Sequence, residues 1–263
     1  MELEICVDSV ESAMAAEAGG ADRVELCSAL NEGGLTPSLG LMRAVRSKIN
    51  IGMYVMIRPR GADFVYSPAE IECMLTDISA AADEGADGVV LGLLKPDGSV
   101  DVEQTSLLVA QAAPMRVTFH RALDMASDLD AAMKAIVQTG AHRVLTSGAA
   151  PTAALGAKRI TSMVRAAGSK LGVMVCGHVR PENVGEIAQA TGAREFHASL
   201  RKPADSPMIF RNTNLQLGDP YQDDYARYAI APEDVRRLRD AVDAIGDPRA
   251  ASSPSRRRDK QLR

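Results

Sequence analysis

The sequence has no long hydrophobic run, little net charge and few cysteines, and each of these absences excludes a class of protein. No apolar stretch among the 263 residues approaches the about 18 that a membrane-spanning helix needs. The formal net charge is only −4, so the whole chain carries no electrostatic signal for binding nucleic acid. Met1 leads directly into an expected strand, without a basic segment and a hydrophobic segment before it, so an ordinary secretory signal is not expected.

The four cysteines show no paired spacing. This pattern is more typical of reduced thiols in the cytoplasm than of a disulfide framework. Cys73 falls in an apolar helical segment, where we expect it to act as a small core residue.

A short phrase of glycine, alanine and a polar residue returns four times and indicates the architecture. Each copy ends a helical pattern and opens a strand, and one further strand lies between consecutive copies. With a first strand over residues 2–7, the chain has eight strands that alternate with helices, which predicts a parallel sheet. At this length the prediction is a single-domain (β/α)₈ TIM barrel. The copies are Gly20-Ala21-Asp22, Gly85-Ala86-Asp87, Gly140-Ala141-His142 and Gly192-Ala193-Arg194.

The expected barrel covers residues 1–246 and is followed by a tail. The segment 202–231, rich in Asp, Pro and Tyr, is too long for an ordinary connection, so we expect it to cover the rim partly or to mediate subunit contact. A final helix is expected over residues 232–245. Residues 247–263 form a basic Ser/Pro/Arg tail with almost no apolar residues, which predicts disorder.

Side chains alternate along each strand, so every second residue is expected to face the barrel lumen. A purely structural barrel fills these positions with branched aliphatic residues. Here many are ionisable, which is costly without pairing and indicates a functional pocket at the rim. The expected inward side chains include Glu4, Cys6, Glu25, Cys27, Arg58, His120, Cys176, Glu195 and His197.

The strand ends carry a series of motifs that resembles the CutC copper-homeostasis family from residue 1 to about 245. They include LEICVDS at 3–9, GGADRVELCS at 19–28, GGLTPS at 33–38, MIRPR at 56–60, TFHRA at 118–122, LTSG at 145–148 and FHAS at 196–199. The resemblance implies a cytosolic (β/α)₈ barrel that is connected with copper tolerance and binds Cu(I).

Two cysteines are the candidate copper ligands. Cys6 and Cys27 lie at the ends of adjacent expected strands, which are about 4.8 Å apart, so both sulfurs can reach one ion. Soft thiolates in low coordination suit Cu(I), and the resemblance points to the same two residues. The alternative is that two small buried thiols only fill the lumen.

A second hypothesis is an enzyme that acts on a small anionic or carbonyl metabolite, with an indirect role in copper handling. Glu25, His120 and His197 are its candidates for acid–base catalysis. The candidates for substrate binding are Arg58, Arg60, Ser147 and Ser199. The alternative is a hydrogen-bonded barrel floor without chemistry. In either case we expect a homo-oligomer that binds a copper ion or a small anionic ligand.

One turn departs from the family pattern. Residues 176–180 (CGHVR) contain a single glycine where the family has a glycine-rich turn. The loss weakens the expectation of a backbone cradle for phosphate at this place. It also adds the Cys176 thiol and the His178 imidazole to the rim.

Overall fold

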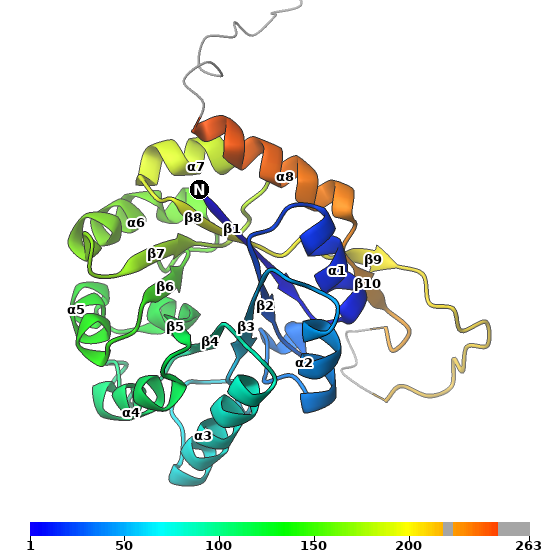
Figure 1. Ribbon diagram of the computed structural model, residues 1–263, viewed down its shortest axis with the longest axis horizontal. Helices are drawn as coiled ribbons and strands as arrows, with labels where there is room; N and C mark the ends of the chain where they lie inside the picture. Colours follow the sequence, from blue (N-terminus) through cyan, green and yellow to red (C-terminus); the bar gives the residue numbers. More distant parts are fainter. Residues whose placement is uncertain (218–222, 247–263) are drawn as a thin grey trace, which may run out of the picture.

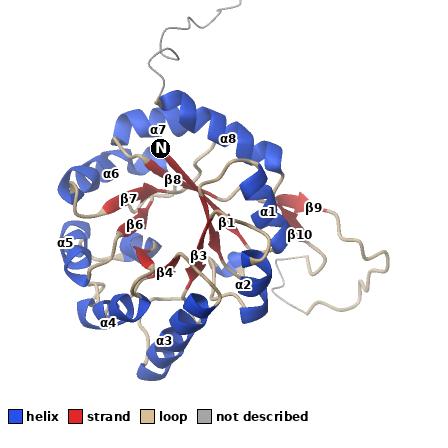
Figure 2. Cartoon of the chain, in the orientation of Figure 1, coloured by secondary structure: helices blue, strands red, loops and turns tan. Residues whose placement is uncertain are grey.

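The chain folds into a closed barrel of eight parallel strands inside a ring of helices, as Figures 1 and 2 show. The computed structural model describes residues 1–217 and 223–246. The barrel strands follow one another in sequence order, and β8 closes the sheet against β1. They are β1 (Glu2–Val7), β2 (Arg23–Leu26), β3 (Gly52–Met56), β4 (Gly88–Leu91), β5 (Arg116–Phe119), β6 (Arg143–Thr146), β7 (Gly172–Val175) and β8 (Glu195–Ala198). The TIM barrel predicted from the alternation is confirmed.

The helices alternate with these strands, and two short 3₁₀ helices lie at the carboxyl ends of β2 and β5. The α-helices are α1 (Val10–Ala18), α2 (Leu39–Arg46), α3 (Pro68–Asp83), α4 (Val102–Ala112), α5 (Leu129–Thr139), α6 (Ala153–Ala167), α7 (Val184–Thr191) and α8 (Pro232–Ile245). The 3₁₀ helices are η1 (Leu30–Glu32) and η2 (Arg121–Met125). The final helix has the bounds that the sequence predicted.

The recurring glycine phrase works as a helix stop. Gly140 and Gly192 follow α5 and α7 with φ of 81° and 72°, in the left-handed region that glycine adopts without steric cost. The next residue in each copy, Ala141 or Ala193, is buried as the chain turns into the following strand. The phrase therefore marks every second return from the helical layer to the barrel, before β2, β4, β6 and β8.

The strand side chains alternate as the sequence predicted. In β1, Leu3, Ile5 and Val7 belong to the apolar layer between strands and helices. Cys6 instead packs inside the barrel in a separate small cluster with Cys27, Tyr54, Met56 and Val90. Cys6 on β1 and Cys27 just after β2 therefore both point into the lumen, away from the helices.

A network of ion pairs fills the lower lumen, near the amino ends of the strands. The Arg23 guanidinium donates to Glu4 Oε2 at 2.7 Å and to Glu195 Oε2 at 2.9 Å, and it also pairs with Glu2. Arg143 pairs with the same Glu195 carboxylate. Glu195 therefore belongs to the floor of the barrel and not to the rim.

The segment after β8 forms a two-stranded antiparallel ribbon, β9 (Lys202–Ala204) and β10 (Arg227–Ala229). Figure 1 shows that most of its described part projects beside the barrel, outside α1 and α2. Tyr228 of β10 nevertheless lines a hollow at the rim, so the described part of the segment covers the rim only at this edge. The basic tail 247–263 lies outside the described residues. Among the described helices, none combines the length and apolar character needed to cross a membrane.

Candidate functional site

A cavity of about 770 Å³ opens at the carboxyl ends of the barrel strands. Its walls come from the ends of β1, β2, β3, β5 and β8 and from the loops that follow β3 and β4. The predicted site residues that line it are Cys6, Glu25, Arg58, His120, His197 and Ser199. Glu4 and Cys27, which the alternation also directs inward, lie fully buried beneath this surface.

The two lumen thiols are neighbours. Cys6 Sγ and Cys27 Sγ are 4.0 Å apart, and Cys27 Sγ lies 3.6 Å from Glu25 Oε2. One ligand atom from each of these three residues falls within 4.8 Å of the others, so the group can surround a single metal ion. Cys6 on β1 lies opposite Glu25 on β2 in the sheet register. Cys27 follows Glu25 by two residues, so its side chain points to the same face of the sheet and reaches Cys6.

His197 connects this group to the ion pairs of the floor. Its Nδ1 lies 2.7 Å from Glu4 Oε1, and its Nε2 lies 3.9 Å from Glu25 Oε2. Glu4 in turn accepts from Arg23. Burial alone would raise the pKa of Glu4, but the hydrogen bond from His197 and the charge of Arg23 lower it to about 2. Glu4 is therefore a fixed carboxylate that orients and charges the imidazole.

The thiol and imidazole ionise in opposite senses. The hydrogen bond from Cys27, followed by the interaction with His197, lowers the pKa of Cys6 to about 5 against the cost of burial. Burial would lower the pKa of His197, but the nearby Glu25, Cys6 and Glu4 raise it well above its usual range. At neutral pH the arrangement therefore favours a Cys6 thiolate beside a His197 imidazolium.

Cys27 and Glu25 keep their protons more tightly. The hydrogen bond to Cys6 and burial raise the pKa of Cys27 well above its usual range. Burial and the charge of Cys6 do the same for the pKa of Glu25, whose Oε1 is buried without a hydrogen-bond partner among the described residues. A buried carboxyl group with a raised pKa is a candidate for proton uptake or release.

His120 differs from His197. Its Nδ1 accepts from the backbone N–H of Ala122 at 3.2 Å, so Nε2 carries the proton of the neutral ring. That Nε2 is buried and has no partner among the described residues. Burial and the charge of Arg58 lower the pKa of His120 to about 3. Near neutral pH His120 is thus a hydrogen-bond donor to the cavity and not a proton carrier.

Arg58 is held by the loops at the rim. It donates from Nη1 to the carbonyls of Glu32 and Gly34 and from Nη2 to the carbonyl of Ala62. Its guanidinium also stacks 5.1 Å from the centre of the Phe64 ring. Much of its fork is therefore engaged by the protein, while Nε is buried without a partner in the described chain.

The remaining predicted substrate-binding residues lie apart from one another. Arg60 binds Glu70 and Asp63 in the loop before α3 and does not line the cavity. Ser147 is fully buried and shares hydrogen bonds with Asp124 and Arg121. Only Ser199 faces the opening. The structure therefore does not bring these three together as one binding surface.

Two other cysteine expectations have different outcomes. Cys73 is exposed on α3, so the expectation that it fills the core is wrong. The core-facing positions of α3 include Ile71, Met74 and Ile78, and at helical spacing Cys73 falls on the other side of the helix. Cys176 is buried in the lumen as expected, and burial raises its pKa to about 12.

One functional-looking residue was not singled out by the sequence patterns. The Asp124 carboxylate in η2 accepts from Thr146, from the backbone N–H groups of Ser147 and Ala149, and from Arg121. It thereby ties the β5 end to the β6 end. The only signal for Asp124 in the sequence was its position two residues after the TFHRA motif at 118–122, because it lies on a 3₁₀ helix and not on a strand.

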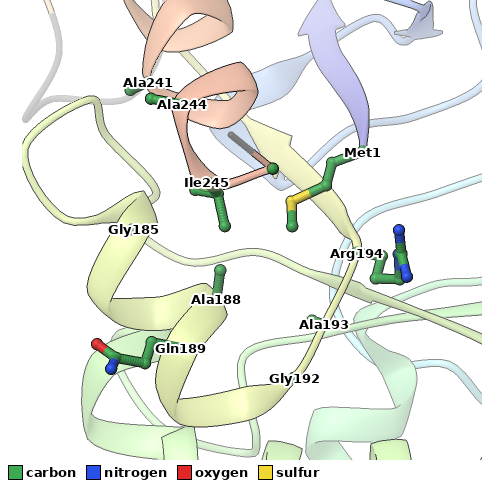
Figure 3. Close-up of a pocket in the computed structure, with 11 residues that line it drawn as sticks. Met1, Gly185, Ala188, Gln189, Gly192, Ala193, Arg194, Ala241, Ala244 and Ile245 are labelled. Atoms are coloured by element: carbon green, nitrogen blue, oxygen red, sulfur yellow. The ribbon is translucent and has the colours of Figure 1, made fainter. Parts of the chain in front are cut away.

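A second hollow of similar size, about 790 Å³, lies at the opposite end of the barrel. Figure 3 shows it between α7, α8 and the chain start, with Met1, Ala188, Ala244 and Ile245 around it. The polar side chains of its wall are Gln189 and Arg194. It contains no cluster of titratable groups, so the chemistry lies in the cavity at the strand ends.

Comparison with known proteins finds relatives that cover most of the chain. A model described as the CutC family matches residues 1–202. The chain is 45% identical over 241 residues to a CutC family protein of Chromobacterium violaceum, covering 92% of this chain and 98% of that protein. It is 45% identical over 237 residues to the human copper homeostasis protein cutC homolog, covering 90% and 86%. The crystal structure of a copper homeostasis protein CutC from Streptococcus agalactiae has a TM-score of 0.71 and 32% identity, covering 75% of this chain and 97% of that one.

Proposed function

The chain belongs to the CutC family, and we propose that it handles copper by binding Cu(I) through the thiolates of Cys6 and Cys27. The observation that carries the proposal is the 4.0 Å approach of the two sulfurs inside the barrel. Thiolates are soft ligands that suit Cu(I) in low coordination. The human relative is named a copper homeostasis protein.

The charges around the two sulfurs favour a monovalent cation with two thiolates. Such a complex carries one net negative charge, and the buried imidazolium of His197 lies beside it to compensate. Cys6 already favours the thiolate, whereas Cys27 holds its proton. Binding therefore releases the Cys27 proton, so Cu(I) affinity rises with pH. The cavity gives access to Cys6, with Cys27 directly behind it.

Native mass spectrometry of protein purified without reducing or chelating additives tests the proposal. We expect one Cu(I) per chain in the wild type and none in the Cys6→Ser/Cys27→Ser double variant. A wild-type protein that takes up no Cu(I), or a double variant that binds as much as the wild type, would overturn it.

A second function is favoured by the size of the cavity. A volume of about 770 Å³ far exceeds the need of one ion and lies in the about 300–1,000 Å³ range of small-molecule sites. We propose that a small anionic or carbonyl metabolite binds above the thiols. The unpaired Glu25 Oε1 and His120 Nε2 are then free to contact it. Glu25 would exchange the proton, while the charged His197 and the neutral N–H of His120 would stabilise developing negative charge.

Thermal-shift and turnover screens of metabolite fractions test this second function. Glu25→Gln should keep the fold and ligand binding but abolish turnover, because an amide cannot exchange the proton. Arg58→Lys should impair binding, because a point charge cannot replace the fork that shapes the rim. If no fraction binds to the wild type or is changed by it while Cu(I) binds, the enzyme function fails.

We also propose that the protein is a cytoplasmic homo-oligomer. Its thiols must stay reduced to bind Cu(I), which suits the cytoplasm. The segment between β9 and β10 exposes Ile209, Phe210 and Leu217 by 97%, 70% and 82%. Apolar side chains gathered on a projecting segment are typical of a contact surface, and we assign it to a second copy of this chain. Sedimentation of an Ile209→Asp/Phe210→Asp variant should show a smaller species than the wild type.

A further inference from the structure

A smaller hollow of about 370 Å³ lies at the rim beside the main cavity, between the loops that follow β7 and β8. Arg121, Arg180 and Arg201 line it, together with the imidazoles of His178 and His197. No carboxylate is among its lining residues in the part of the chain that the structure describes. A concave surface with several cations and no acid attracts anions.

The three guanidinium groups are held in place but keep donors unused. Arg121 is fixed by Asp124 and Ser147 through Nε and Nη2. Arg201 donates from Nη1 to Asp8 at 3.3 Å. Arg180 donates from Nη1 to the carbonyl of Val179, and no described carboxylate pairs with it. Arg180 therefore brings a positive charge that the protein itself leaves uncompensated.

The hollow is continuous with the cavity above the thiols. Four residues line both: Arg121, His197, Ser199 and Arg201. A molecule can therefore place a charged end at the rim and its remainder in the lumen. Ser199 lies at the junction, where its hydroxyl can donate to an oxyanion.

We propose that this hollow binds the phosphate group of a phosphorylated small molecule, held by Arg180, Arg201 and Arg121. Guanidinium forks match phosphate oxygens in bidentate geometry, and the charge of Arg180 is not paired with a carboxylate among the described residues. Side chains thus take the place of the glycine-rich backbone cradle that the turn at 176–180 lacks. The position agrees with the general tendency of (β/α)₈ barrels to bind phosphate between the last two strands. The placement of the organic part in the lumen rests on the second proposed function.

Titration calorimetry with inorganic phosphate tests the rim site, at constant ionic strength and with acetate as the monoanion for comparison. We expect the wild type to bind phosphate and Arg180→Gln to weaken binding by about 10–100-fold, the effect of losing a charged hydrogen-bond donor. Arg180→Lys should lie between the two. Arg165→Gln, on the exposed surface of α6, is the matched control and should bind as the wild type does.

Cu(I) titration of the same variants separates this proposal from the copper site. Arg180→Gln should bind Cu(I) like the wild type, since its side chain lines the rim hollow and not the main cavity. The phosphate site would be overturned if the wild type bound no phosphate or if Arg180→Gln bound phosphate as tightly as the wild type. It would also be overturned if the wild type bound acetate as tightly as phosphate. Joint loss of phosphate and Cu(I) would contradict a separate rim site. Inorganic phosphate needs only the rim, so a failed metabolite screen leaves its result standing.

Discussion

Cys6 on β1 and the residue just beyond β2, Cys27, bring their sulfur atoms within 4.0 Å of each other in the lumen. The two thiols differ in pKa although they touch: their mutual hydrogen bond and the interaction with His197 lower the pKa of Cys6, whereas the contact with Cys6 and burial raise the pKa of Cys27. The imidazolium of His197 stabilises the same thiolate from the next strand around the barrel. The two thiols therefore differ in their ionisation and do more than fill space in the lumen.

Cys6→Ser and Cys27→Ser should each weaken Cu(I) binding. Loss of a side chain that hydrogen-bonds a metal ligand typically costs about 10–100-fold in metal affinity, and loss of the soft ligand itself should cost more. Competition with a chromophoric Cu(I) chelator measures the change. Cys73→Ser, at an exposed position on α3, is the control and should leave the affinity unchanged. Equal losses in all three variants would contradict a specific site.

Cys6 should react as a thiolate at a pH far below that at which an ordinary cysteine thiol ionises. In a Cys73→Ser background, alkylation by iodoacetamide should show a midpoint near pH 5, the pKa of Cys6. Cys27→Ser and His197→Gln should each move the midpoint upward, because each removes a group that stabilises the thiolate. Cys176, whose pKa is raised to about 12, should remain unmodified. A wild-type midpoint above pH 8 would contradict the thiolate–imidazolium pair.

His120 should make the protein less stable as the pH falls. Its pKa is about 3 in the folded protein, whereas an unfolded histidine titrates near 6.5. Between these values the unfolded state binds a proton that the folded state refuses, so stability is present above pH 6.5 and is lost on acidification. His120→Gln should remove about 2 kcal/mol of the wild-type loss between pH 7 and pH 5.

Urea denaturation at the two pH values measures this difference in the free energy of unfolding. If the free energy of unfolding changed equally with pH in the wild type and in His120→Gln, the buried imidazole would take up its proton without cost to stability.

Arg23→Met should destabilise the fold strongly. Removing the guanidinium leaves the fully buried Glu4 without its main cation and also releases Glu195. Breaking a buried ion pair by removing one partner costs about 3–5 kcal/mol. Arg43→Met, which breaks an exposed pair with Glu84, should have little effect. Thermal and urea unfolding of both variants measure the loss of stability. Equal losses in the two variants would contradict a stabilising role of the ion pairs at the floor of the barrel.

Local sequence patterns were enough to predict the barrel and the direction of its side chains. The recurring glycine phrase and the alternation along the strands are local properties, so they can be recognised without knowing which segments pair. The bounds of β1 and α8 and the inward direction of Cys6 and Cys27 followed from them. Helical faces were less secure, and Cys73 lies on the exposed side of α3.

The depth of each side chain in the barrel, its ionisation and the grouping of distant residues depend on tertiary contacts. Strand stagger sets how far along the barrel axis each inward side chain lies, and it depends on pairing between segments far apart in the chain. It placed Glu195 on the floor and His197 against Glu4, while His120 stayed unpaired. Because burial and neighbouring charge shift a pKa together, two histidines of equal sequence appearance ended with opposite charge states.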